Sequence, residues 1–101
     1  MSQDLIDKIS AHCNEIVKRD EEMLKWRFQV VQSELEHIAG IATSIVLHKA
    51  GLRNGGGFVE AASSNSLVGA ALRADHVMQK VLAYIATFVD QADSIYNKYK
   101  I

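Results

Sequence analysis

The sequence predicts an all-α protein organised as one long antiparallel helical hairpin. Between Leu67 and Tyr99, apolar residues recur at steps of three and four, the pattern of a helix packed lengthwise on another helix. The chain contains no proline, which favours long uninterrupted helices. Its 101 residues, 49% of them hydrophobic, fit one domain over 1–101 with a single core.

The first helix is expected to run from about residue 4 to residue 50. Apolar residues follow helical spacing from Leu5 to Ile45, with a one-residue slip across the polar run 18–22. Every residue of that run except Asp20 is a good helix former, so we favour a continuous helix over the alternative, a bend. Such a helix is about 70 Å long. Gly51 is a natural left-handed C-cap, and Leu52 can complete a Schellman contact.

A glycine-rich turn over about 51–57 separates the two helices. The second helix then begins either at about residue 58 or, after a capped loop, at about residue 66, and it ends near residue 100. We expect Phe58 and Val59 to be packed in both cases. With the turn centred on 54–55, Gly40 faces Gly69, and small residues on both sides predict a close crossing there.

Helix two carries more apolar surface than one partner helix can cover. Two further rows lie beside its main seam, and one of them contains Val77 and Tyr84. We therefore expect dimerisation into a four-helix bundle, with a second copy or with a different helical protein. The predicted interface is Val77 and Tyr84, with Trp26, Met23 and Val30 of helix one as further candidates.

Composition and charge exclude several functional classes. The net charge is −1 and no basic stripe stands out, so nucleic acid is not an expected partner. No apolar run approaches the length of a membrane span, and the N-terminus lacks the pattern of a secretory signal peptide. We expect a cytoplasmic location; export, if it occurs, uses no cleavable signal peptide. Cys13 is the single cysteine and is interpreted as a small core residue.

The chain shows no catalytic signature, so we expect no enzymatic activity, no cofactor and no metal. The strongest candidate for metal chemistry is Glu34-x-x-His37, a spacing that di-iron helical bundles use on inward-facing helices. Helix two offers no glutamate to complete such a site. A solvated helix face is therefore the preferred interpretation, and a small metal-binding bundle is the third functional hypothesis.

A chain of about a hundred residues with two long helices and the central turn Arg53-Asn54-Gly55-Gly56-Gly57-Phe58 resembles the small helical-hairpin proteins of bacterial type VII secretion. The family turn carries a Trp-x-Gly motif, whereas the tryptophan of this chain, Trp26, lies mid-helix. The family's C-terminal signal has an aromatic residue four positions before an acidic one, whereas the acidic residues after Phe88 follow at two and five positions. The resemblance implies a dimeric four-helix bundle that acts as a co-secreted substrate or targeting partner.

The sequence therefore favours a non-enzymatic protein–protein interaction module that binds its partner helix to helix. A type VII secretion substrate or targeting partner is the specific form that the resemblance implies. The alternative is a small helical inhibitor or immunity protein that blocks a partner with one face of the hairpin.

Overall fold

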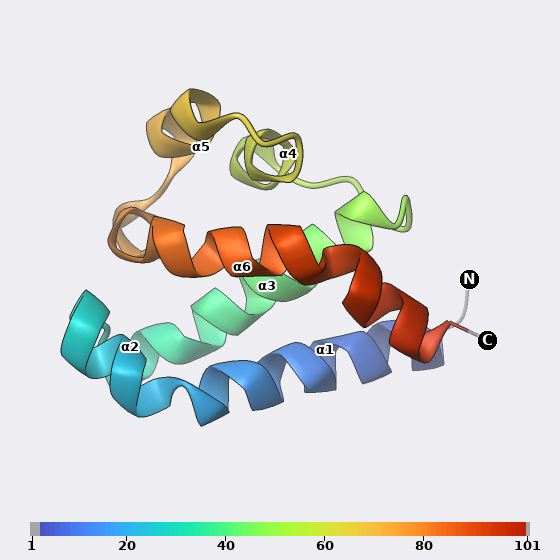
Figure 1. Ribbon diagram of the computed structural model, residues 1–101, viewed down its shortest axis with the longest axis horizontal. Coiled ribbons are helices and arrows are strands. Elements are labelled where there is room, and N and C mark those ends of the chain that lie inside the picture. Colours follow the sequence, from blue (N-terminus) through green and yellow to red (C-terminus); the bar gives the residue numbers. More distant parts are fainter. Residues whose placement is uncertain (1–2, 101) are drawn as a thin grey trace.

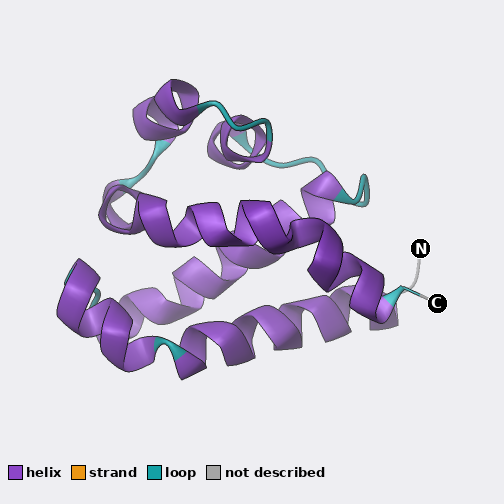
Figure 2. Cartoon of the chain, viewed as in Figure 1, coloured by secondary structure: helices purple, strands orange, loops and turns teal. Residues whose placement is uncertain are grey.

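The structure, a computed structural model, describes residues 3–100 (Figure 1). This part of the chain is helical apart from its turns, so the all-α prediction is confirmed (Figure 2). Its elements are α1 (Gln3–Arg19), α2 (Glu21–Phe28), a 3₁₀ turn η1 (Gln32–Glu34), α3 (Leu35–Lys49), α4 (Gly57–Ser63), α5 (Leu67–Arg73) and α6 (His76–Tyr99). None of these helices is both long and apolar enough to cross a membrane.

Three helices, α1, α3 and α6, enclose the main apolar core. α3 packs against both α1 and α6, and α1 also contacts α6 (Figure 1). Each helix therefore has two neighbours, which buries apolar rows that a two-helix hairpin would leave exposed. The largest fully buried side chains come from all three helices, and α2 adds one more: Ile9, Cys13, Leu24, Ile38, Ile45, Val46, Leu47, Met78, Val81 and Ile85.

The predicted continuous helix over residues 4–50 is replaced by α1, α2 and α3. The longest dimension of the molecule is 37 Å, too short for a helix of about 70 Å. α1 ends at Arg19, so the chain breaks at the polar run rather than continuing through it. A sharper turn follows at Gln29, which has a left-handed φ of 58°. Turning back there places Val30 in the core and lays α3 beside α1, and this burial explains the correction.

The end of α3 matches the sequence prediction. Gly51 has a φ of +77°, and its N–H donates to the His48 carbonyl at 3.0 Å. The N–H of Leu52 donates to the Leu47 carbonyl at 2.9 Å, which closes the predicted Schellman motif. The C-cap at Gly51 is therefore confirmed.

The region after the turn forms two short helices before α6 begins. Phe58 and Val59 of α4 are buried, as predicted. Ser66 caps α5, because its hydroxyl accepts the Gly69 N–H at 3.1 Å. Asp75 then caps α6 by accepting the Met78 N–H at 2.8 Å. The predicted second helix is thus divided into α4, α5 and α6.

This division also overturns the predicted hairpin register. α6 runs in the same direction as α3 and antiparallel to α1 (Figure 1). Gly40 of α3 is exposed, and a methyl group added there would meet nothing within 4 Å. Gly69 packs against Ala61 of α4 instead, with 3.2 Å from an added Cβ to the Ala61 Cβ. The predicted close crossing of Gly40 and Gly69 is therefore wrong, because residues 57–73 do not continue the arm.

Candidate functional site

An apolar groove with a volume of about 560 Å³ opens between the α4–α5 pair and α6. Such a volume lies within the range of about 300–1,000 Å³ that is typical of ligand sites. Its walls are mainly aliphatic and aromatic, with a few polar groups at the rim. The apolar lining includes Phe58, Ala62, Leu67, Ala70, Leu82 and Val89. We call this feature the α5–α6 groove.

The groove exists because α5 packs mainly against α4 and stands away from α6 (Figure 1). Two glycines allow α4 and α5 to approach closely. A Cβ at Gly57 would lie 2.9 Å from the Arg73 Cδ, and a Cβ at Gly69 would lie 3.2 Å from the Ala61 Cβ. On the opposite wall, α6 presents the small exposed side chain of Ala86. The space between α5 and α6 is therefore left unfilled.

Three large apolar side chains of α5 are exposed beside this groove. Leu67 is 75% exposed, Val68 71% and Leu72 79%, and Leu67 also lines the groove. We call these three residues the α5 face. Scattered apolar residues are ordinary on protein surfaces, but here three lie on one seven-residue helix: Val68 and Leu72 are one helical turn apart, and Leu67 lies at the groove. The α5 face and the α5–α6 groove together form the candidate functional site.

Charged groups lie at the ends of this site. Arg73, the last residue of α5, does not line the groove: its side chain lies against Gly57 and Gly69 on the α4 side of α5, and its guanidinium donates to the Gly69 carbonyl at 3.3 Å. Asp90 and Lys49 line the groove, and the Lys49 ammonium donates to the Val89 carbonyl at 3.3 Å. Within residues 3–100, neither Arg73 nor Asp90 forms an ion pair. Both charges therefore remain available to a binding partner.

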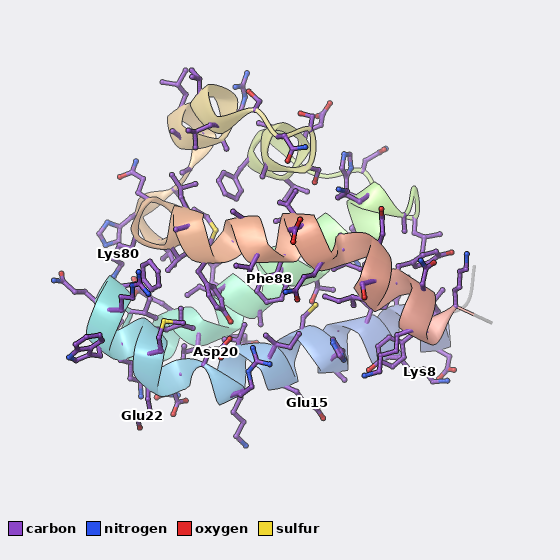
Figure 3. All side chains as sticks on the ribbon, viewed as in Figure 1. Lys8, Glu15, Asp20, Glu22, Lys80 and Phe88 are labelled. Atoms are coloured by element: carbon purple, nitrogen blue, oxygen red, sulfur yellow. The ribbon has the colours of Figure 1, made fainter. Side chains whose placement is uncertain are left out.

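Tyr84, which was predicted to lie at the centre of a partner interface, belongs to the intramolecular core. Its side chain is 6% exposed, and its hydroxyl donates to the Asp20 carboxylate at 2.8 Å. Phe88, which lies on α6 (Figure 3), packs edge-on against the Tyr84 ring, with 5.5 Å between ring centroids. Burial, followed by the hydrogen bond to Asp20, raises the pKa of Tyr84. The structure therefore corrects this part of the predicted interface.

The other predicted interface residues are not brought together on one free surface. Val30 is buried at 3% exposure, and Met23 and Val77 are half-buried against the core. Trp26 alone among the five is fully accessible, with 83% of its surface exposed. It lies on α2, whereas the candidate site lies on α4, α5 and α6. Trp26 consequently forms a second, separate surface feature.

The proposed metal pair, Glu34 and His37, is engaged by α6. The Lys80 ammonium donates to Glu34 Oε1 at 2.7 Å and lowers the pKa of Glu34. His37 Nε2 lies 2.7 Å from Asp75 Oδ2. Among residues 3–100, no three histidine, cysteine or acidic side chains are grouped closely enough to hold a metal ion. The pair therefore serves to attach η1 and α3 to the start of α6.

Cys13 is a core residue, as predicted. Its side chain is fully buried, and this burial raises the pKa of the thiol to about 11. A thiol with such a pKa remains protonated at neutral pH, and the protonated form is neither a good nucleophile nor a metal ligand.

Sequence reasoning placed Leu67 in the buried seam of helix two and therefore missed the α5 face. The sequence feature that indicates a break between α5 and α6 is Asp75, a good N-cap residue three positions before Met78. A helix start at that point separates Leu67 and Leu72 from the seam of α6. Comparisons of the chain with protein-family models, curated proteins and solved structures gave no significant match.

Proposed function

We propose that the protein is a non-enzymatic interaction module that binds a helix of a partner protein at the α5–α6 groove. The observation that carries the proposal is the pairing of an open apolar groove of about 560 Å³ with the exposed α5 face beside it. Helix-in-groove recognition uses such a surface, because apolar side chains on one face of a helix enter the groove while its polar face stays in water. Polar groups at the rim, here Lys49 and Asp90, then fix orientation.

The free energies of burial and association require that the partner cover both the α5–α6 groove and the α5 face. Burying the α5 face alone contributes roughly 3–7 kcal/mol, because its three side chains are about three quarters exposed. Association costs roughly 4–15 kcal/mol in lost translational and rotational freedom, and a micromolar complex needs about 8 kcal/mol net. Contacts inside the groove must therefore supply the remainder. A ligand that touches only the outer side of α5 would bind too weakly to be specific.

The sequence favoured a four-helix bundle of two hairpins, with the row containing Val77 and Tyr84 between them. Because Tyr84 is buried within one chain, we propose the α5 region in place of that row. The resemblance to type VII secretion partners rests on two long helices, which the structure replaces with shorter ones, so support for helix-to-helix binding comes from the groove and the α5 face. A targeting role in such a system is the specific form we propose to test first.

The experiment is affinity capture from the native host, followed by reconstitution with the purified partner. Wild-type protein is compared with Leu72→Asp and with the control Trp26→Asp, which alters the other exposed apolar residue of comparable accessibility. We expect the partner to bind wild type and Trp26→Asp but not Leu72→Asp. Calorimetry should show a negative heat-capacity change, the signature of apolar burial. Equal binding by all three proteins would reject the α5 face, and with it the two-part site as proposed, because Leu72 belongs to that face and does not line the groove.

A further inference from the structure

One end of the α5–α6 groove carries two opposite charges that do not form an ion pair with each other. Lys49 of α3 and Asp90 of α6 both line the groove. The Lys49 ammonium donates to the Val89 carbonyl at 3.3 Å, which places it next to the backbone of Asp90. Among the ion pairs of residues 3–100, none joins Lys49 to Asp90. This end of the groove therefore offers a hydrogen-bond donor and a hydrogen-bond acceptor close together.

Both groups retain hydrogen-bonding capacity that the chain does not use. An ammonium has three N–H donors, and the bond to the Val89 carbonyl occupies one of them. A carboxylate accepts at both oxygens, and Asp90 pairs with no cation within residues 3–100. Lys49 and Asp90 are exposed, so water can satisfy them in the free protein. A ligand that displaces this water binds well only if it replaces both kinds of hydrogen bond.

The rest of the groove favours an uncharged, aliphatic ligand. The walls include Phe58, Leu82 and Val89, together with the small side chains of Ala83 and Ala86. Its volume of about 560 Å³ lies within the range of small-molecule sites, which are mainly apolar with a few polar groups that fix orientation. The two charges that line the groove sum to zero. A charged ligand would therefore be attracted by one of them and repelled by the other.

We propose that the α5–α6 groove binds a small neutral amphiphile, an aliphatic chain that ends in a carboxamide. The chain lies along the apolar walls, and the head group meets Lys49 and Asp90. Its carbonyl oxygen accepts a hydrogen bond from the Lys49 ammonium, and its N–H donates to the Asp90 carboxylate. A carboxylate head has no proton to donate to Asp90, and an ammonium head has no lone pair to accept from Lys49.

The ligand regulates the proposed function, because it occupies the groove that the partner helix enters. This regulatory part of the inference rests on the proposed function, whereas binding of the ligand does not. Val68 and Leu72 do not line the groove, so they stay exposed when the ligand is bound. Ligand and partner helix therefore exclude each other in the groove, and variants of the groove and of the α5 face can separate the two events.

Titrations of the isotope-labelled full chain, followed by nuclear magnetic resonance, test the head group. The probes are octanamide, octanoate and octylamine, which share an eight-carbon chain and are neutral, anionic and cationic at pH 7. We expect octanamide to shift the amide resonances of Ala83, Ala86 and Asp90, all of which line the groove. Its dissociation constant should lie below about 1 mM, within the affinity range of so small a molecule. Octanoate and octylamine should bind at least fivefold more weakly.

Four variants test the individual contacts. Asp90→Asn removes the repulsion of an anionic head and should tighten octanoate at least threefold. Lys49→Met keeps an apolar stem without the ammonium and should tighten octylamine by a similar factor. Ala86→Phe fills the groove and should weaken all three probes at least tenfold with unchanged circular dichroism. The control is Ala11→Phe, because Ala11 is exposed on α1, on the other side of α6 from α4 and α5, and should alter no affinity (Figure 1).

The outcomes separate the ligand from the partner helix. Wild type that binds octanoate or octylamine as tightly as octanamide would overturn the assigned head group. Resonances that stay in place with all three probes at about 2 mM would overturn the ligand site, and Leu72-dependent capture of a host protein would then leave the proposed function standing. If octanamide binds and no capture depends on Leu72, the ligand site stands and the proposed function fails. Where both bind, saturating octanamide must weaken capture, and undiminished capture would overturn the regulation.

Discussion

The hydrogen bond between the side chains of Tyr84 and Asp20 allows a direct test of whether Tyr84 stabilises the fold of its own chain or contacts a partner. The Tyr84 hydroxyl donates to Asp20 Oδ2 at 2.8 Å and so joins α6 to the junction of α1 and α2. Asp20 lies at that junction (Figure 3). The same carboxylate accepts two bonds from Arg19, at 2.9 and 3.0 Å. Tyr84→Phe removes one hydroxyl and keeps the ring that packs on Phe88.

The expected loss of stability follows from the charge on the acceptor. A hydrogen bond to a charged group contributes about 1.5–3 kcal/mol net. The Asp20 side chain is 19% exposed and retains Arg19, so water and the guanidinium compensate in part after the hydroxyl is removed. We therefore expect Tyr84→Phe to lower the free energy of unfolding by the lower end of this range, about 1.5 kcal/mol. For a domain of this size, that loss lowers the melting temperature by roughly 6–12 °C.

The effect also depends on pH with a defined sign. The bonds from Arg19, and then the bond from Tyr84, hold the pKa of Asp20 below its ordinary value in the folded protein. A depressed folded-state pKa contributes stability above the unfolded-state pKa, and this contribution is lost as pH falls through the folded-state pKa. The difference in stability between wild type and Tyr84→Phe should therefore be largest near neutral pH and shrink in strong acid.

Thermal and urea denaturation monitored by circular dichroism measure the change, and light scattering reports assembly in the same samples. Tyr96→Phe is the matched control, since Tyr96 is half-buried and its hydroxyl forms no hydrogen bond within residues 3–100. We expect the control to change stability by less than about 0.5 kcal/mol. A double-mutant cycle with Asp20→Ala should give a coupling of at least about 0.5 kcal/mol. Equal stability of the two phenylalanine variants would refute the reasoning, as would altered assembly in Tyr84→Phe with unaltered unfolding.

Three further substitutions test other features of the fold. Gly40→Ala should raise the free energy of unfolding by about 1 kcal/mol, because the residue is exposed within α3 and an added methyl group meets nothing within 4 Å. Gly69→Ala should lower the melting temperature instead, since its methyl would lie 2.7 Å from the hydroxyl that caps α5. Asp75→Ala should cost about 1 kcal/mol in urea denaturation through loss of the cap bond to Met78. Cys13 should react with a thiol reagent at pH 8 only after denaturation, because burial raises its pKa to about 11.

The parts of the fold that were predictable from the sequence depend on local signals. Gly51 terminates α3 because a left-handed residue is needed there, and glycine adopts that conformation without steric cost. The apolar spacing from Met78 to Ile95 correctly identified the buried side of α6. Both features can be recognised without knowing what lies on the other side of the helix.

The turns that shape the molecule depend on tertiary contacts instead. Gln29 and Asn65 adopt left-handed φ values of 58° and 61°, which costs a non-glycine residue roughly 1 kcal/mol or more. Burial of Val30 and the bond from the Lys80 ammonium to the Gln29 carbonyl at 3.2 Å compensate for the first. The heptad pattern of the sequence does not indicate these tertiary contacts. For that reason, the chain reversal at Gln29 and the resulting three-helix core could not be predicted.

The candidate site was missed for a related reason, and that reason bears on its function. Leu67 and Ala71 fit the seam of α6 in sequence, so an unbroken helix from 67 to 99 would have aligned them with Met78. The chain instead breaks before Asp75 and exposes the α5 face. That exposure forgoes roughly 3–7 kcal/mol of apolar burial, an amount comparable to the net stability of a small domain, about 5–15 kcal/mol. Contact with a bound partner, the role proposed for the α5 face, would recover this burial.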